Sequence, residues 1–297
     1  MERRKFIYNS SMVALSVSVF GKIKWNGSSF IGNDPTTADI LGPYYRPGAP
    51  IRRDLVQPGT KGDITRFAGT IFGNDGRTPE KNALVEIWHC NENGVYDNTT
   101  DDYMYRASWK TGADGKYDFK TIMPVPYKVT ETRYRPAHIH MRISGTTGQD
   151  LVTQIYFKGD KYLSIDDSSS DPKSIHRILD ISTNSNGERL IQFDVVLQDA
   201  YRLDAAGYSK IEGLYDFGNN MMAEFYHAGD DLFVKINGQI EEAMEYKGNN
   251  SFEGGLGQVK VRFELLPDNV VKAHASYPGD DDKVVNIEGT RLLKYPS

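Results

Sequence analysis

The chain of 297 residues is 39% hydrophobic and 25% charged, and its formal net charge at pH 7 is −5. This composition is typical of a globular protein long enough for two domains. It excludes a general nucleic-acid binder, because the chain has no basic run interleaved with aromatic residues that could follow a phosphate backbone. The single cysteine, Cys90, excludes an intramolecular disulfide and a cysteine-rich metal site. We expect Cys90 to be a small buried hydrophobe.

Residues 1–35 are expected to be an export signal and a linker. The sequence RRKFI at residues 3–7 precedes a weakly apolar, Ser-rich stretch over 12–20, and this order resembles a bacterial twin-arginine signal. The apolar stretch is too short to cross a membrane as a helix. We therefore expect an exported, periplasmic or extracellular protein; a cytoplasmic protein with a basic tail is the alternative. Residues 27–34 are rich in Gly, Ser and Asn and predict a flexible linker.

Residues 36–203 predict a first domain of short β-strands. Runs of β-branched and aromatic residues alternate with Gly, Asp, Asn and Pro turns, at a spacing typical of an all-β sandwich. The predicted strands are Ile64–Phe72, Ala83–Cys90, Lys116–Thr121, Ala137–Ile143, Leu151–Phe157 and Leu190–Leu197. Helical periodicity is sparse, and we expect one short helix over Ser174–Asp180.

Residues 208–297 predict a second, smaller β-rich domain, either a barrel or a meander. The predicted strands cover 222–226, 231–235, 259–263 and 270–274. This part of the sequence has no candidate catalytic cluster. Its lone histidines, His227 and His274, are expected to be structural. The acidic run at 280–282 lacks the spaced oxygen ligands of a calcium loop and predicts a solvated turn.

A His-x-His pair in the predicted strand 137–143 suggests a metal site. Successive side chains of a strand point to opposite faces, so His138 and His140 would share one face while Ile139 enters the core. Pro136 withholds an N–H from the sheet and restricts the residue before it, which indicates a loop becoming a strand. The two imidazoles are therefore expected at a strand end.

Tyrosines rather than carboxylates are the candidates to complete this site. No carboxylate lies close to the pair on the same strand, whereas Tyr96 and Tyr127 each follow a predicted strand. A phenol has a pKa of about 10 and is a poor ligand for a divalent ion. A hard trivalent ion such as Fe³⁺ can displace the phenol proton. Two phenolates and two imidazoles would give a ferric site of low net charge, suited to an anionic, bidentate oxygen ligand such as a catecholate.

Several short motifs lie in order between residues 36 and 199. They are LGPYY (41–45), VEIWH (85–89), NGVY (93–96), DGKYDFKT (114–121), YRPAHIH (134–140) and TQIYFKGD (153–160). Together they resemble the motifs of the intradiol ring-cleavage dioxygenases, the family of protocatechuate and catechol dioxygenases. The resemblance implies that the β-sandwich is the catalytic domain.

The resemblance also implies which residues bind the metal. Tyr96 and His140 match the family's equatorial ligands of a non-haem Fe³⁺, and Tyr127 and His138 match the axial ligands. Tyr127 would be the phenolate that substrate displaces, and it could take a substrate proton as it leaves.

Arg135 and Gln154 match the family's catalytic residues around the metal. Arg135 would stabilise negative charge on the substrate ring, a role that suits a permanently charged, planar guanidinium. Gln154 would be a polar residue near the oxygen site. The implied reaction takes a small aromatic diol and O₂, and cleaves the ring between the two hydroxyl-bearing carbons to give a muconate-type diacid. This is a step in the catabolism of aromatic compounds.

Departures from the family limit what the resemblance implies. Lys128-Val129 stands where protocatechuate-type enzymes have an aromatic pocket residue, so the ring substituent is open. A homo-oligomer is left open as well. Residues 208–297 resemble, more faintly, the small β-rich domain appended to some serine hydrolases of the β-lactamase-like group, and we expect them to serve packing or partner binding.

Two other functions compete with the dioxygenase reading of the sequence. One is an exported, non-catalytic β-sandwich of the transthyretin-like type that acts as a binding module. It does not account for the presence of both tyrosines and both histidines. The other is a divalent-metal hydrolase that uses His138 and His140, and it leaves Tyr96 and Tyr127 without a role.

Overall fold

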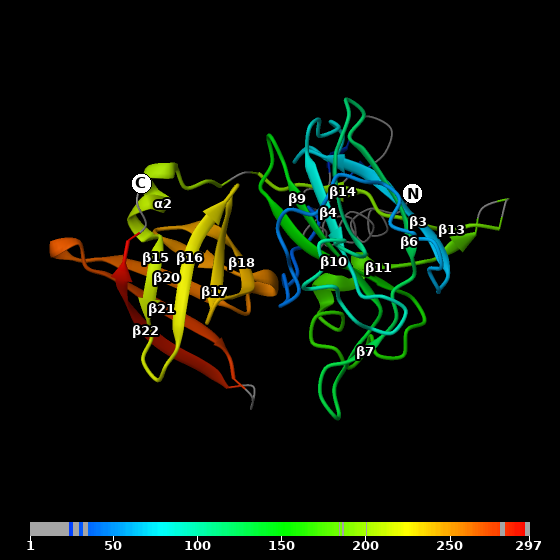
Figure 1. Ribbon diagram of the computed structural model, residues 1–297. Coiled ribbons are helices and arrows are strands. Elements are labelled where there is room, and N and C mark those ends of the chain that lie inside the picture. Colours follow the sequence, from blue (N-terminus) through cyan, green and yellow to red (C-terminus); the bar gives the residue numbers. More distant parts are fainter. Residues whose placement is uncertain are drawn as a thin grey trace, which may run out of the picture.

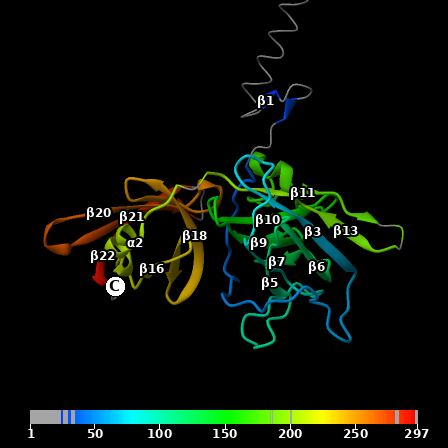
Figure 2. The same cartoon turned by 90° about the horizontal axis from the view of Figure 1, so that it is seen from above.

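The computed structural model of the protein shows two β-rich domains side by side (Figures 1 and 2). The described residues are 24–25, 30–31, 35–183, 185, 187–199, 201–279 and 283–294. The expected export signal and the acidic run at 280–282 lie outside them. Within these residues, no helix is long and apolar enough to span a membrane. β1 (Lys24–Trp25) pairs with β2 (Phe30–Ile31) ahead of the first domain.

The first domain is a sandwich of two five-stranded sheets, which confirms the all-β prediction. One sheet has the strand order β11-β10-β9-β4-β5, and the other has β12-β13-β3-β14 with β6 paired to β3. The first sheet consists of β4 (Leu84–Trp88), β5 (Arg106–Lys110), β9 (His138–Ser144), β10 (Leu151–Phe157) and β11 (Ile178–Leu179). The second consists of β3 (Ile64–Phe72), β6 (Lys116–Ile122), β12 (Ser182–Thr183), β13 (Arg189–Gln192) and β14 (Val195–Val196).

The structure differs from the predicted elements of this domain in several places. The run 190–197 is split into β13 and β14, because the Asp194 carboxylate accepts the Thr70 N–H (2.8 Å) where a continuous strand would pair. The segment 174–180 forms the 3₁₀ helix η1 (Pro172–Arg177) and then β11. Strand β5 was not predicted, because its sequence RASWK is short and has only two apolar residues, which is a weak strand signal.

Burial along the strands shows which sheet faces are covered. In β6, Tyr117 and Phe119 are buried while Lys116 and Lys120 are exposed, as expected for a strand with one face in water. By contrast, β9 and β10 are buried along almost their whole length. One face of β9 and β10 lies in the sandwich core, and the second domain and the candidate site cover the other.

Strand register arranges the outer face of β4, β9 and β10 in rows. Tyr156 of β10 lies opposite His138 of β9. In the next row, His140 lies between Gln154 of β10 and Trp88 of β4. In the third row, Arg142 lies between Val152 of β10 and Glu86 of β4. The candidate metal ligands occupy one end of this face. Arg142, at the other end, reaches the second domain.

The second domain is a closed antiparallel barrel in which each strand pairs with its sequence neighbours. Its strands are β15 (Gly213–Asp216), β16 (Met222–Ala228), β17 (Asp231–Ile236), β18 (Gln239–Gly248), β19 (Ser251–Glu253), β20 (Lys260–Leu265), β21 (Val271–Pro278) and β22 (Val284–Leu293). The sequence predicted either a barrel or a meander, and the structure shows the barrel. Helix α2 (Ala205–Ile211) precedes β15 and buries Tyr208 and Ile211 in the barrel core.

An apolar contact joins the barrel to the sandwich. The ring of Phe233 on β17 stacks on Tyr45, with centroids 5.7 Å apart. Tyr45 packs in turn against Trp88 at 5.0 Å. Val152 and Ala243 are buried in the same cluster. The barrel therefore covers the sheet face that carries the candidate site.

A buried ion cluster lies beside this apolar contact. Arg142 of β9 pairs with Glu86 (3.1 Å), Asp150 (3.2 Å) and Asp231 (3.1 Å). It also donates to the backbone carbonyl of Ala228 (2.9 Å). Because Asp231 and Ala228 belong to the barrel, Arg142 links the two domains. Burial raises the pKa of Asp231 to about 7, as expected where one guanidinium faces three carboxylates.

The variant Arg142→Met would leave three carboxylates buried without a cation. We expect it to lower the free energy of unfolding by about 3–5 kcal/mol, measured by urea denaturation at neutral pH. Arg66→Met is the matched control, because Arg66 pairs with Asp118 at an exposed position and such pairs contribute about 0–1 kcal/mol. Equal losses in the two variants would contradict the assigned role of Arg142.

Glu242 of β18 is a further buried acid at the interface. Its Oε1 accepts the backbone N–H of Leu41 and of Ala243, both at 3.1 Å. Burial raises the pKa of Glu242 to about 8. Since the pKa is higher in the folded than in the unfolded chain, the stability that Glu242 contributes is present at low pH and is lost as the pH rises through about 8.

Replacing Glu242 by Gln removes this titration and keeps an oxygen acceptor at the same place. We expect the stability of Glu242→Gln relative to wild type to rise between pH 5 and pH 9, by up to a few kcal/mol, because one pKa unit corresponds to about 1.4 kcal/mol. Unfolding curves recorded across this range test the expectation. The exposed Glu131→Gln should show no such trend, and a Glu242→Gln difference that is flat with pH would refute the expected pKa.

Candidate metal centre

The structure brings the predicted metal-ligating side chains together at one point. His138 and His140 lie on the same face of β9, with their Nε2 atoms 3.2 Å apart. The Tyr96 hydroxyl lies 3.1 Å from His138 Nε2. The hydroxyl of Tyr127, in β7 (Tyr127–Lys128), is hydrogen-bonded to Tyr96, and the two rings meet at 83° with centroids 5.7 Å apart.

The hydrogen bonds of His138 determine where its lone pair points. His138 Nδ1 donates to the Pro136 carbonyl at 2.7 Å, because a carbonyl can only accept. His138 Nε2 is therefore unprotonated and directs its lone pair at His140 and Tyr96. The donors thus face one point, which suits a cation. No group of three or more His, Cys, Asp or Glu side chains with this capacity occurs in the described residues, so the phenols must complete any donor set at this point.

Burial sets the protonation of these ligands. It lowers the pKa of His138 and of His140 well below the usual range, so both imidazoles are neutral. It raises the pKa of Tyr96 well above the usual range and that of Tyr127 to about 12. Neutral imidazoles are ready ligands, whereas the phenols need a strongly charged cation to lose their protons. The donor set therefore fits a hard trivalent ion such as Fe³⁺.

Two glycines allow the ligands to approach the centre. Gly94 has a φ of +77°, and a Cβ at this position would lie 2.7 Å from the Cβ of Tyr127. Gly42 has a φ of +76°, and its Cβ would lie 3.2 Å from Cε1 of His140. Both glycines belong to the motifs LGPYY and NGVY, so these motifs are needed for steric reasons as well as for their side chains.

Aromatic stacking holds the ligand rings in orientation. Trp88 stacks on His140 with a centroid distance of 4.8 Å and an angle of 7°. Tyr44 stacks on Tyr96 at 4.3 Å and 19°. Tyr44 and Tyr45 of the motif LGPYY each pack against an aromatic side chain.

Arg135 and Gln154 share one buried network next to the ligands. Arg135 is part of β8 (Tyr134–Arg135), which pairs with β7. Its Nη2 donates to Gln154 Oε1 at 2.7 Å, and its Nε pairs with Asp166 at 2.6 Å. Gln154 Nε2 donates to the Ile40 carbonyl at 2.7 Å. The positive charge of Arg135 opposes the rise in the Tyr127 pKa, so the guanidinium acts electrostatically on that phenol.

Sequence analysis missed the residues that hold this network. The Tyr156 hydroxyl lies 2.9 Å from Asp39 Oδ2 and 3.1 Å from Gln154 Oε1. Arg177 pairs with Asp39 and donates to the Gln154 carbonyl at 2.8 Å. Tyr156 could have been found by strand alternation, since it shares a face with Gln154 and lies opposite His138. Asp39 and Arg177 are far apart in sequence and gave no signal.

The remaining histidines for which the structure gives hydrogen bonds lie outside the candidate centre. His89 bonds the Cys90 carbonyl and the Thr121 hydroxyl, both at 2.7 Å. His227 bonds Glu212, and His274 bonds Glu264. These contacts are consistent with the structural role expected for His227 and His274.

Comparison with known proteins defines the class to which this fold and site belong. A model of the dioxygenase family matches residues 40–199. Chlorocatechol 1,2-dioxygenase of Rhodococcus opacus is 31% identical over 206 residues, which are 60% of this chain and 75% of that protein. Catechol 1,2-dioxygenase 2 of Acinetobacter lwoffii is 38% identical over 151 residues, which are 44% of this chain and 54% of that protein.

Solved structures agree with this class. Catechol 1,2-dioxygenase from Pseudomonas arvilla C-1 superposes with a TM-score of 0.50 at 28% identity, over 58% of this chain and 64% of that one. 3-Chlorocatechol 1,2-dioxygenase from Rhodococcus opacus 1CP shares the fold with a TM-score of 0.51 at 23% identity, over 57% of this chain and 74% of that one. The first domain thus has the fold of a ring-cleaving oxidoreductase. The chain belongs to the intradiol dioxygenase family.

The variant Tyr156→Phe removes the hydroxyl that joins Asp39 to Gln154. We expect it to lower the free energy of unfolding by about 1–3 kcal/mol, since the buried Asp39 carboxylate loses a donor. Thermal unfolding by circular dichroism measures the loss. Tyr103→Phe is the control, because the Tyr103 hydroxyl makes only an exposed bond of 3.3 Å to the Pro47 carbonyl. A loss in Tyr156→Phe no larger than in this control would contradict the role of Tyr156.

Proposed function

We propose that this protein is a non-haem Fe³⁺ dioxygenase that cleaves a catechol-type aromatic diol between its two hydroxyl-bearing carbons, using O₂, to a muconate-type diacid. The observation that carries the proposal is the convergence of two phenols, one buried and one partly buried, and two neutral imidazoles at one point. The relatives that carry the names catechol and chlorocatechol 1,2-dioxygenase support the substrate class.

Tyr96, Tyr127, His138 and His140 would hold the metal. Fe³⁺ held there would supply a Lewis acid that activates a catecholate towards O₂. The ligands differ in burial, because Tyr96 is 7% exposed and both histidines 1%, whereas Tyr127 is only partly buried and lies on a hairpin of two-residue strands. Tyr127 is therefore the ligand best placed to leave.

Tyr127 would act as the base for a substrate hydroxyl. Burial raises the pKa of Tyr127 to about 12, so its oxygen binds a proton strongly once it is free of a cation. The phenolate oxygen of Tyr127 would thus take the proton of one substrate hydroxyl as it leaves, and remain beside the site as a neutral phenol.

Arg135 would stabilise the negative charge of the deprotonated substrate. Its guanidinium is 9% exposed and is fixed by Asp166 and Gln154, so its direction is set before substrate arrives. Fixed positive charge in a buried site stabilises developing negative charge without reorganisation. Gln154 would orient Arg135 through this bond and line the oxygen side of the site.

The alternatives account for less of the structure. A transthyretin-like binding module or a divalent-metal hydrolase gives no reason for phenols directed at imidazole lone pairs. We further propose export through the twin-arginine-like sequence at residues 3–7. The β-lactamase-type likeness of the second domain and a homo-oligomer stay predictions.

Visible spectra of the iron-loaded protein test the proposed function. We expect a broad tyrosinate-to-iron band that shifts when catechol is added without O₂. Tyr127→Phe should keep a coloured catechol complex and lower kcat by about 10²- to 10⁴-fold, because the base is lost. Tyr96→Phe should lose most of the band in both states.

Tyr134→Phe is the control variant, since the Tyr134 ring stacks on Tyr162 away from the ligands. Its spectrum and kcat should match those of wild type. A colourless protein that contains stoichiometric iron would overturn the assignment of Tyr96 and Tyr127 and favour the binding module.

A further inference from the structure

The barrel is filled at one end and hollow at the other. Near α2, the rings of Tyr215, Phe225, Phe252 and Phe263 pack at steep angles with centroids 5.1–5.8 Å apart. Towards the opposite end, the barrel contains a cavity of about 570 Å³. Pockets for small molecules commonly measure about 300–1,000 Å³, and small eight-stranded barrels can hold one small ligand.

The walls of this cavity are apolar side chains without packing partners on one side. They come from several strands and turns and include Phe217, Met221, Ile236, Val259, Tyr277 and Ile287. Each of them is only half-buried, although it faces the barrel interior. Filled interiors bury such side chains almost completely, so these walls have room for an apolar guest.

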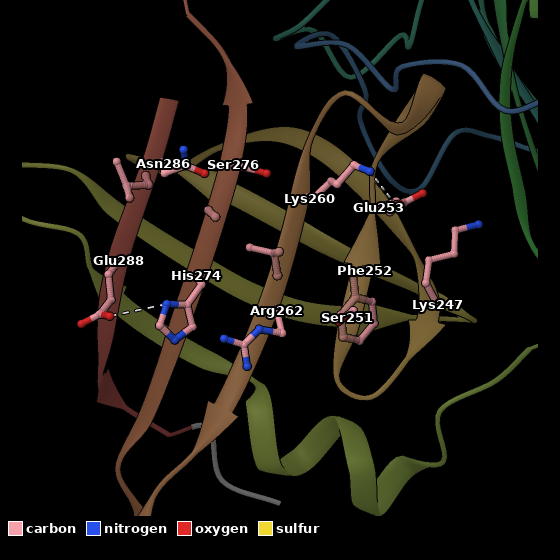
Figure 3. A pocket seen from close by; sticks show the side chains of 13 residues that line it. Lys247, Ser251, Phe252, Glu253, Lys260, Arg262, His274, Ser276, Asn286 and Glu288 are labelled. Carbon is pink, nitrogen blue, oxygen red and sulfur yellow. Dashed lines mark ion pairs between the residues drawn. The ribbon is translucent and has the colours of Figure 1, made fainter. Parts of the chain in front are cut away.

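The outer face of the same strands is polar. Figure 3 shows Arg262, His274 and Glu288 side by side there, with His274 Nδ1 3.4 Å from Glu288. Ser276 and Asn286 share this outer face (Figure 3), while their neighbours Ala275 and Ile287 line the cavity. The two faces of β21 and β22 thus differ as strand alternation requires. At these positions the apolar side chains line the cavity and the polar ones lie outside.

The rim of the cavity has carboxylates and a neutralised cation. The Glu241 side chain lies on the barrel side, and the buried Glu242 next to it already accepts two backbone N–H groups. Arg133 and Asp167 reach the rim from the sandwich and pair with each other. The one cation in the described lining is thus already paired, so the rim disfavours a carboxylate ligand. Carboxylate oxygens accept hydrogen bonds, so the rim suits a ligand that donates them.

We propose that the barrel cavity is a second binding site, separate from the metal centre, for an uncharged aromatic molecule that bears a hydroxyl group. The ring would lie between Phe217, Tyr277 and the methionine side of the wall, where sulfur and ring edges make favourable contacts. The hydroxyl would point at the carboxylate of Glu241 on the rim. This site goes beyond the proposed ring cleavage and holds whether or not the metal centre is loaded.

Binding of an uncharged fluorescent probe, N-phenyl-1-naphthylamine, to the full-length protein tests the site. We expect saturable binding of one probe per chain, equal in metal-free and iron-loaded protein. 2-Naphthol should displace the probe, and adipate should not. No saturable binding to folded wild type, or equal displacement by adipate, would overturn the proposal. Because metal-free protein suffices, a negative result here differs from failure of the dioxygenase activity.

Matched substitutions on neighbouring strand positions locate the probe. Ala275→Phe fills the cavity, whereas Ser276→Phe places the same ring outside. We expect the first to raise the Kd for the probe at least tenfold and the second to leave it unchanged. Ile287→Trp and Asn286→Trp form an independent inward and outward pair on β22, in case one inward variant does not fold. Probe binding unchanged in folded inward variants would overturn the assignment of the cavity.

Discussion

The whole site depends on strand β9 being buried on both faces. Its core face inserts Ile139, Met141 and Ile143 into the sandwich, which fixes the strand in depth and register. Because side chains alternate, His138, His140 and Arg142 are then forced onto the other face, in one line. The first two form the candidate metal centre, and the third binds the barrel. A single-residue slip of β9 would remove all three at once.

The barrel and the metal centre are joined by direct packing. Phe233 of the barrel stacks on Tyr45, Tyr45 packs on Trp88, and Trp88 stacks on His140. His140 is thus supported by a stack of aromatic rings, and the last ring of this stack, Phe233, belongs to the second domain. The buried Arg142 guanidinium also fixes the orientation of the barrel on the sheet. Two carboxylates of the sandwich and one of the barrel must all reach it. Apolar packing and a buried ion cluster together position the barrel on the sheet.

Much of the sandwich and the ligand set could be predicted, because their signals are local. The alternation in YRPAHIH places both histidines on one face, and apolar runs mark β3 and β10. Strand β5 was missed since RASWK is short and has only two apolar residues, and its neighbours, β4 and the segment at Ile51, are distant in sequence. The Arg142 cluster was also missed, because Asp231 lies 89 positions away in sequence. Residues that meet only through register or domain contact leave no local pattern.

The candidate centre has a fixed side and a weakly held side. Tyr96, His138 and His140 are buried and stacked against other rings. Tyr127 is on the β7–β8 hairpin, which has two residue pairs of its own. Short, partly exposed elements open locally at low free energy. Arg133, in the turn of this hairpin, also forms part of the rim of the barrel cavity. The least constrained ligand is therefore carried by a short hairpin whose turn lies beside the barrel cavity.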